Sequence, residues 1–119
     1  MAWEVEYTDQ FEIWWTSLTD DEQADVSASV ELLELHGPQL GRPHVDTIKG
    51  SRHPNMKELR TQSGGDPLRT FFAFDPRRTA ILIIGGDKTG DRRFYDRMVP
   101  IADELYDVYL NEIEREGLV

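Results

Sequence analysis

Residues 56–86 read MKELRTQSGGDPLRTFFAFDPRRTAILIIGG, and they contain three runs of strand-forming residues separated by two turns. The runs are Met56–Gln62, Leu68–Asp75 and Ala80–Gly86, with turns at residues 64–67 and 76–79. Polar and apolar residues alternate in the first two runs, whereas residues 81–84 are all apolar. Alternation is typical of a half-exposed strand, and a continuous apolar run is typical of a strand buried on both faces. The segment therefore predicts an antiparallel meander whose third strand is central in the sheet.

The sequence before this segment predicts one short strand and two helices. Residues 3–7 alternate between apolar residues and glutamates, as in a strand with one wet face. Two capping-box patterns follow, Asp9 with Glu12 and Thr19 with Glu22, and each begins a helix-like stretch. The apolar stripes are Phe11, Trp14, Trp15 and Leu18 in the first helix and Val26, Val30 and Leu33 in the second.

The remaining segments complete the predicted order of elements. Gly37-Pro38 ends the second helix, and residues 38–55, with three prolines, are expected to form a long surface loop. Residues 87–96 are predicted to be a polar loop, and Pro100 is expected to open the last helix. That helix carries its apolar stripe on Ile101, Leu105, Tyr109 and Ile113. The order β-α-α-β-β-β-α predicts one α+β domain over residues 1–119, an antiparallel sheet with helices packed on it.

The composition excludes several kinds of protein. There are no cysteines, which rules out a disulfide framework, thiolate zinc sites and a cysteine nucleophile. The N-terminus has no apolar signal-peptide region, and no apolar run approaches the roughly 20 residues that span a bilayer. His36, His44 and His53 are not spaced as metal ligands. We therefore expect a cytoplasmic protein with no membrane segment, no metal and no small-molecule cofactor.

Charge is unevenly distributed along the chain. The net charge is −10, and residues 1–47 hold one basic residue against 11 acidic ones. Residues 98–119 hold one basic residue against six acidic ones, so the other 11 basic residues lie in residues 48–97, with six acids. An acidic chain argues against indiscriminate binding of nucleic acid, but this basic region can still hold a phosphate ligand.

The first two strands of the meander place ionisable side chains together. Because side chains alternate, Glu58 and Arg60 share one strand face and Lys57 lies on the other. Arg69 falls between bulky apolar residues on the next strand, where a half-buried guanidinium needs an anion. Arg69 or Arg60 could simply pair with Glu58 across the strands. Alternatively, the guanidinium groups bind a phosphate, whose oxygens suit their forked donors.

Residues 85–95 form a second candidate site, after the buried strand. Gly85 and Gly86 would let a ligand approach the backbone closely, although the spacing is not that of a P-loop. The segment then supplies three cations and two aromatic rings: Lys88, Arg92, Arg93, Phe94 and Tyr95. The rings could stack on unpaired bases. The alternative is an ordinary soluble turn with Phe94 in the core.

Four strings, Met56–Arg60, Leu68–Pro76, Gly85–Lys88 and Arg93–Tyr95, resemble the phage-derived HigB-like branch of the RelE/ParE toxin superfamily. The resemblance covers nearly the whole chain, and the family's order of elements matches the predicted one. It implies a RelE-like fold and a toxin of a type II toxin–antitoxin system. The partners it implies are a cognate helix-turn-helix antitoxin, mRNA and the ribosome.

The resemblance also implies a chemistry, metal-free cleavage of RNA by attack of the ribose 2′-hydroxyl on the adjacent phosphate. Arg69 corresponds to the family's strand arginine at the scissile phosphate, Lys88 to a basic residue after the last strand, and Tyr95 to an aromatic hydroxyl. Glu58 stands where some relatives have lysine, so it either acts as the base or holds Arg60 and Arg69 in place. The residues expected to bind RNA are Lys57, Arg92, Arg93 and Phe94.

The acidic charge keeps other functions open. Relatives that work on the ribosome are typically basic, because they dock on rRNA phosphates. The acidic helices must therefore face away from RNA, or the protein acts on something else. The alternatives are a ParE-like inhibitor that binds gyrase and an inactive phage-derived binding protein. Cleavage would leave 5′-hydroxyl ends in mRNA, whereas a gyrase inhibitor would cause DNA damage.

Overall fold

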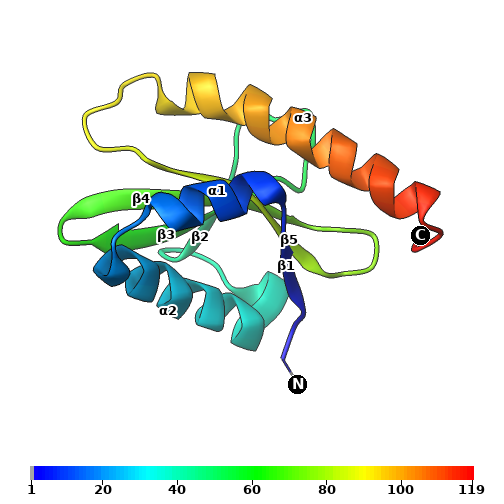
Figure 1. Ribbon diagram of the computed structural model, residues 1–119, viewed down its shortest axis with the longest axis horizontal. Helices are drawn as coiled ribbons and strands as arrows, with labels where there is room; N and C mark the ends of the chain where they lie inside the picture. Colours follow the sequence, from blue (N-terminus) through cyan, green and yellow to red (C-terminus); the bar gives the residue numbers. More distant parts are fainter. Residues whose placement is uncertain (1) are drawn as a thin grey trace.

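The computed structural model describes residues 2–119 and has a five-stranded sheet with α1 and α2 on one face and α3 on the other (Figure 1). The elements are β1 Val5–Tyr7, α1 Asp9–Ser17, α2 Asp20–His36, the 3₁₀ turn η1 Gly37–Gln39, β2 Val45–Thr47, β3 Lys57–Ser63, β4 Asp66–Phe74, β5 Ala80–Asp87 and α3 Phe94–Arg115. The strands lie in the order β1-β5-β4-β3-β2. The α+β class predicted from the sequence is confirmed.

The predicted meander is formed by β3, β4 and β5, which pair antiparallel. Arg60 lies opposite Arg69, and Phe72 lies opposite Leu82. β5 is an interior strand as expected, although β4 is the middle one. The sheet is mixed and not wholly antiparallel, because β1 pairs parallel to β5. The parallel pairing is possible because the long stretch of chain from α1 to β4 separates β1 from β5.

Each face of the sheet has its own apolar core. The core under α1 and α2 contains Phe11, Leu33, Val45, Leu59, Phe72, Ala80 and Leu82. The core under α3 includes Met56, Phe71, Ile81, Ile83, Phe94, Ala102 and Tyr106. Neighbouring residues of β4 and β5 therefore serve opposite cores, as the side-chain alternation of strands requires. Of the described residues, no helix is both long and apolar enough to cross a membrane.

Two predicted boundaries were wrong. The segment predicted to be a loop over residues 38–55 contains β2, in which Val45 pairs with Leu59 and Thr47 with Lys57. Its three residues are too few to give a pattern, and the pairing is visible only in the folded chain. The last helix begins at Phe94, so the expected loop is shorter and Pro100 lies inside the helix. Burial of Phe94 against the sheet outweighs the hydrogen bond that a proline removes.

One of the two predicted helix caps is confirmed and the other is wrong. Thr19 and Glu22 form the expected capping box at α2, with reciprocal hydrogen bonds of 2.9 and 3.2 Å. Thr8, and not Asp9, caps α1, because its hydroxyl oxygen accepts from the Phe11 backbone N–H at 3.1 Å. The same hydroxyl donates to the Ile83 carbonyl at 2.6 Å. Thr8 therefore joins the start of α1 to the sheet.

The C-terminal half of α3 is tied to the β4–β5 turn by three residues that we call the Asp75 cluster: Asp75, Arg77 and Tyr109. Asp75 accepts the backbone N–H groups of Arg77 and Thr79 at 2.8 and 3.0 Å. It also accepts the Tyr109 hydroxyl at 2.6 Å and the Arg77 Nε at 3.1 Å. Burial would raise the pKa of Asp75, but the hydrogen bonds from Tyr109, Thr79 and Arg77 outweigh it and hold that pKa below its usual range.

Candidate functional site

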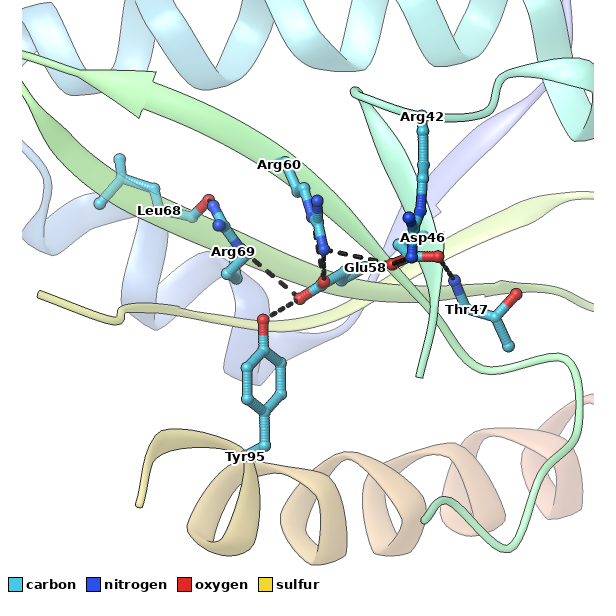
Figure 2. Close-up of polar contacts among 8 residues, drawn as sticks. All are labelled: Arg42, Asp46, Thr47, Glu58, Arg60, Leu68, Arg69 and Tyr95. Carbon is cyan, nitrogen blue, oxygen red and sulfur yellow. Dashed lines mark hydrogen bonds and ion pairs between the residues drawn. The ribbon is translucent and has the colours of Figure 1, made fainter. Parts of the chain in front are cut away.

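A buried carboxylate lies at the centre of the candidate site. Glu58 is on the α3 face of β3 and is only 3% exposed. The Tyr95 hydroxyl, from the first turn of α3, donates to Glu58 Oε1 at 2.6 Å. On the other oxygen, Arg60 Nε donates to Oε2 at 3.1 Å. Figure 2 shows these side chains pointing toward one another from β3 and α3. We call Glu58, Arg60, Arg69 and Tyr95 the Glu58 cluster.

Arg69 enters the cluster from β4, opposite Arg60 in the sheet register. Its Nε lies 3.6 Å from Glu58 Oε1, close enough for an ion pair but too far for a hydrogen bond. One terminal nitrogen donates to the Leu68 carbonyl at 3.0 Å. Within residues 2–119, the buried Nε has no hydrogen-bond acceptor. A buried N–H without an acceptor costs roughly 1–3 kcal/mol, so the pairing of Arg69 is incomplete.

Thr70 carries the other buried side-chain polar atom that lacks a partner within the described residues. Because neighbouring strand residues point to opposite faces, this hydroxyl lies on the α1–α2 side, away from Glu58. It is therefore not part of the cluster.

The sequence predictions missed two residues that extend the charge network. Asp46 lies opposite Glu58 on β2, and its Oδ2 is 3.2 Å from Arg60. Arg42 binds the same oxygen at 2.8 Å. The hydrogen bond from Arg42, with smaller effects of the Thr47 backbone N–H and Arg60, holds the pKa of Asp46 below its usual range. The only sequence signal was the Val45-Asp46-Thr47 alternation, which is too short to identify a strand.

Tyr95 keeps its proton in this setting. Burial is the main cause that raises the pKa of the Tyr95 hydroxyl, and its hydrogen bond to Glu58 adds to the effect. The nearby Arg69 opposes this rise but does not cancel it. Lys88 lies beside the same ring, with Nζ 5.3 Å from its centroid, a cation–π distance. The structure therefore brings together five of the predicted site residues: Glu58, Arg60, Arg69, Lys88 and Tyr95.

The other predicted RNA-binding residues have mixed outcomes. Arg92 and Arg93 are exposed in the loop before α3, three and two residues before Tyr95. Lys57 does not belong with them, because it points to the opposite face of β3 from Glu58. Phe94 is 1% exposed and stacks on Phe71, so the alternative prediction of a core residue is confirmed and the ring is unavailable to a base.

The paired glycines also have a different role from the predicted one. A Cβ on Gly85 would lie 2.2 Å from the Trp14 ring, and one on Gly86 would lie 2.9 Å from the Phe94 ring. The missing side chains therefore make room for aromatic packing on both faces of β5, and not for a ligand.

The charges around the cluster favour an anionic ligand. Four cationic side chains, Arg42, Arg60, Arg69 and Lys88, surround two carboxylates, Asp46 and Glu58. Two arginines, a lysine and a proton-bearing hydroxyl are groups that stabilise a phosphate in a transition state. Among residues 2–119, no three His, Asp or Glu side chains are placed to hold a metal ion.

Solved toxin structures share the fold. The isolated Escherichia coli RelE toxin matches with a TM-score of 0.60 and 13% identity, over 84% of this chain and 99% of that one. The archaeal RelE–RelB complex from Pyrococcus horikoshii OT3 contains a chain that matches with a TM-score of 0.54 and 15% identity, over 76% and 99%. Identities this low show the fold alone, and they confirm the expected RelE-like architecture.

Sequence relatives are much more similar. HigB3 of Mycobacterium tuberculosis, a protein assigned as a toxin, is 48% identical over 102 residues, 85% of this chain and 88% of HigB3. HigB2 of the same organism, also assigned as a toxin, is 45% identical over 103 residues, 85% of this chain and 51% of HigB2. The family model described as phage derived protein Gp49-like (DUF891) matches residues 13–107. This chain therefore belongs to the Gp49-like family of phage-derived proteins, with HigB toxins among its relatives.

Proposed function

We propose that this protein is the toxin of a type II toxin–antitoxin pair and that it stops growth by cutting mRNA. The assignment of HigB3 and HigB2 as toxins supports the first part, together with the RelE-like fold. The Glu58 cluster supports the second part. We further propose that it acts in the cytoplasm, on mRNA at the ribosome, and that a helix-turn-helix antitoxin silences it.

The observation that carries the proposal is the incomplete pairing of Arg69. Its guanidinium is buried, faces the Glu58 carboxylate and still has an Nε–H without an acceptor in the described chain. A phosphate oxygen would supply that acceptor, and Arg60 could contribute a second guanidinium from the neighbouring strand.

Each step of 2′-hydroxyl transesterification has a suitable group in the Glu58 cluster or, for Lys88, beside it. Glu58 accepts the proton as the 2′ oxygen attacks the phosphorus. Arg69 stabilises the negative charge that develops on the pentacoordinate phosphorane, with help from Lys88. Tyr95 retains its proton and delivers it to the departing 5′ oxygen. The products are a 2′,3′-cyclic phosphate and a 5′-hydroxyl, and Tyr95 regains its proton from solvent or from Glu58.

The arrangement of charge reconciles RNA binding with the overall acidity. The acidic helices α1 and α2 cover the face of the sheet opposite the Glu58 cluster. Arg92 and Arg93, which are exposed next to Tyr95, are then available for the phosphates that flank the cleaved one. The global charge of −10 therefore does not describe the surface that we propose for RNA.

Controlled expression in bacteria with mapping of RNA ends tests the proposal. We expect growth arrest and new 5′-hydroxyl ends within mRNA after induction, and neither effect with an equal amount of folded Arg69→Ala protein. Arrest without new ends, accompanied by DNA damage, would support a gyrase inhibitor instead. Normal growth with abundant folded wild-type protein would contradict the toxin assignment itself.

A further inference from the structure

A second surface feature lies on the opposite side of the sheet from the Glu58 cluster. It is a groove of about 670 Å³ between α1, α2 and the β1 edge of the sheet. Its floor is apolar and is formed by Val5, Tyr7, Phe11, Trp15, Val30 and Leu82. Tyr7 is 58% exposed even though it lies in this floor. Exposed apolar surface of this kind, bordered by polar residues, marks an interaction site.

The border of the groove carries negative charge that the chain does not neutralise. Glu12 comes from α1, and Glu31 and Glu34 come from α2. Within residues 2–119, none of these three carboxylates forms an ion pair. Neither α1 nor α2 contains a lysine or an arginine that could reach them. Cations that pair with these carboxylates would therefore come from a bound partner or from solvent.

The shape of the groove favours a partner that binds through its side chains and not through its backbone. β1 is an edge strand of only three residues, so it offers too few backbone groups to hold an added strand securely. A floor of apolar side chains between two helices instead suits a third helix, whose anchors would recur at positions i, i+3, i+4 and i+7.

We propose that this groove binds an amphipathic helix of a partner protein, with an apolar stripe flanked by lysine or arginine. The apolar stripe would cover the floor, and the basic residues would pair with Glu12, Glu31 and Glu34. Because the groove and the Glu58 cluster lie on opposite faces, such a partner can hold the protein without covering the cluster. The inference does not depend on catalysis.

Two designed 18-residue helical peptides test the proposal on the full-length protein by calorimetric titration. Both carry leucine at i, i+3, i+4 and i+7, and the flanking positions are lysine in one peptide and glutamate in the other. We expect the lysine peptide to bind at least tenfold more tightly than the glutamate peptide. We also expect its affinity to fall in high salt, because the paired charges lie at the surface.

Matched variants distinguish binding in this groove from attraction to the overall negative charge of the protein. Glu12→Lys/Glu31→Lys should weaken binding of the lysine peptide at least tenfold. Glu104→Lys/Glu112→Lys makes the same charge change on exposed positions of α3 and should leave it within about twofold. Tyr7→Ser should weaken binding, whereas Ile13→Ser, at a similarly exposed position of α1 outside the groove, should not. Circular dichroism would verify that each variant is folded.

Several outcomes would overturn the proposal. Equal losses in the two charge-reversal pairs would show that the lysine peptide responds only to net charge. No binding of either peptide would exclude a helix in the groove. If sedimentation shows a dimer that Tyr7→Ser dissociates, the groove is an interface with a second copy. Tighter binding of an uncharged apolar dye than of the lysine peptide would indicate a small-molecule pocket.

Discussion

The Glu58 cluster and the Asp75 cluster are built from the same parts. Each has a buried carboxylate, an arginine two residues later in the chain, and a tyrosine hydroxyl from α3 at 2.6 Å. Asp75 also receives two backbone N–H groups, so its oxygens are fully engaged. Glu58 receives none in the described hydrogen bonds, and Arg69 beside it keeps a buried Nε–H without an acceptor. A complete network is typical of a structural tie, whereas an incomplete one is a place where a ligand can finish the bonding.

Replacing one arginine in each cluster should give opposite results, and the largest effect is expected at Arg69. Arg69→Ala removes a cation that we place on the transition-state phosphate, so RNA cleavage should fall by a factor of hundreds or more, about 3–4 kcal/mol. The fold should change little, because Glu58 keeps its bonds to Arg60 and Tyr95. Cleavage assays and thermal unfolding of the same preparation measure both quantities.

Arg77→Ala is the control for that variant. It breaks the pairs with Asp75, Tyr109 and Glu6, so the midpoint of thermal unfolding should fall while the cleavage rate of the folded fraction is retained. If Arg69→Ala were less stable than Arg77→Ala and its cleavage activity fell only in proportion to the fraction of unfolded protein, the Glu58 cluster would be an ordinary ion pair.

The two tyrosines provide a finer comparison, because removal of one hydroxyl leaves the ring in place. Tyr95→Phe should lower the cleavage rate about a hundredfold, the lower range for loss of a general acid. Its effect on stability should be smaller than that of Tyr109→Phe, because the Tyr95 hydroxyl makes one side-chain hydrogen bond, to Glu58, whereas the Tyr109 hydroxyl makes two, to Asp75 and Arg77. Full activity of Tyr95→Phe would remove the hydroxyl from the proposed mechanism and leave the 5′ oxygen to be protonated by another group.

Tyr109→Phe is expected to affect stability and not cleavage. It removes the hydroxyl that donates to Asp75 and accepts from Arg77, and the side chain of Asp75 is fully buried. Loss of one partner of a buried charged group costs roughly 1–3 kcal/mol. Urea unfolding of Tyr95→Phe and Tyr109→Phe, measured side by side, would show this difference. Equal free energies of unfolding would contradict the structural role given to the Asp75 cluster.

The contrast between the clusters also explains what the sequence could predict. The meander and the shared face of Glu58 and Arg60 follow from local patterns, namely alternation, turn residues and apolar runs. The placement of Asp46 beside Arg60 depends on a three-residue strand that exists only by pairing with β3. Two further errors came from the same source: Phe94 and the glycines of β5 are fixed by aromatic packing between distant segments. Side-chain alternation could place the charged residues of one strand together, whereas Lys88 and Tyr95 were assigned to the site only through the family resemblance. Asp46 was missed because tertiary pairing alone brings it to Arg60.

The smallest expected effect is a pH dependence of stability, which the Asp75 cluster should cause in both acidic and alkaline solution. The folded-state pKa of Asp75 is lowered, so its contribution is present above the ordinary carboxyl pKa near 4 and is lost as pH falls through the folded value. The folded-state pKa of Tyr109 is raised, first by burial and then by the bond to Asp75. Its contribution is therefore complete below the ordinary tyrosine pKa near 10 and is lost as pH rises beyond it.

Urea unfolding at pH 3, 7 and 10.5 measures both losses, and Tyr109→Phe separates them. In Tyr109→Phe, the loss of stability at alkaline pH that belongs to Tyr109 should disappear. Some loss of stability at acidic pH should remain, because Asp75 still accepts the N–H groups of Arg77 and Thr79. Tyr95→Phe should also slightly reduce the loss of stability at alkaline pH, since burial raises the pKa of the Tyr95 hydroxyl as well. If Tyr109→Phe retained the full alkaline dependence of the wild type, the titrating group would lie elsewhere. The bond between Asp75 and Tyr109 would then not be what ties α3 to the turn.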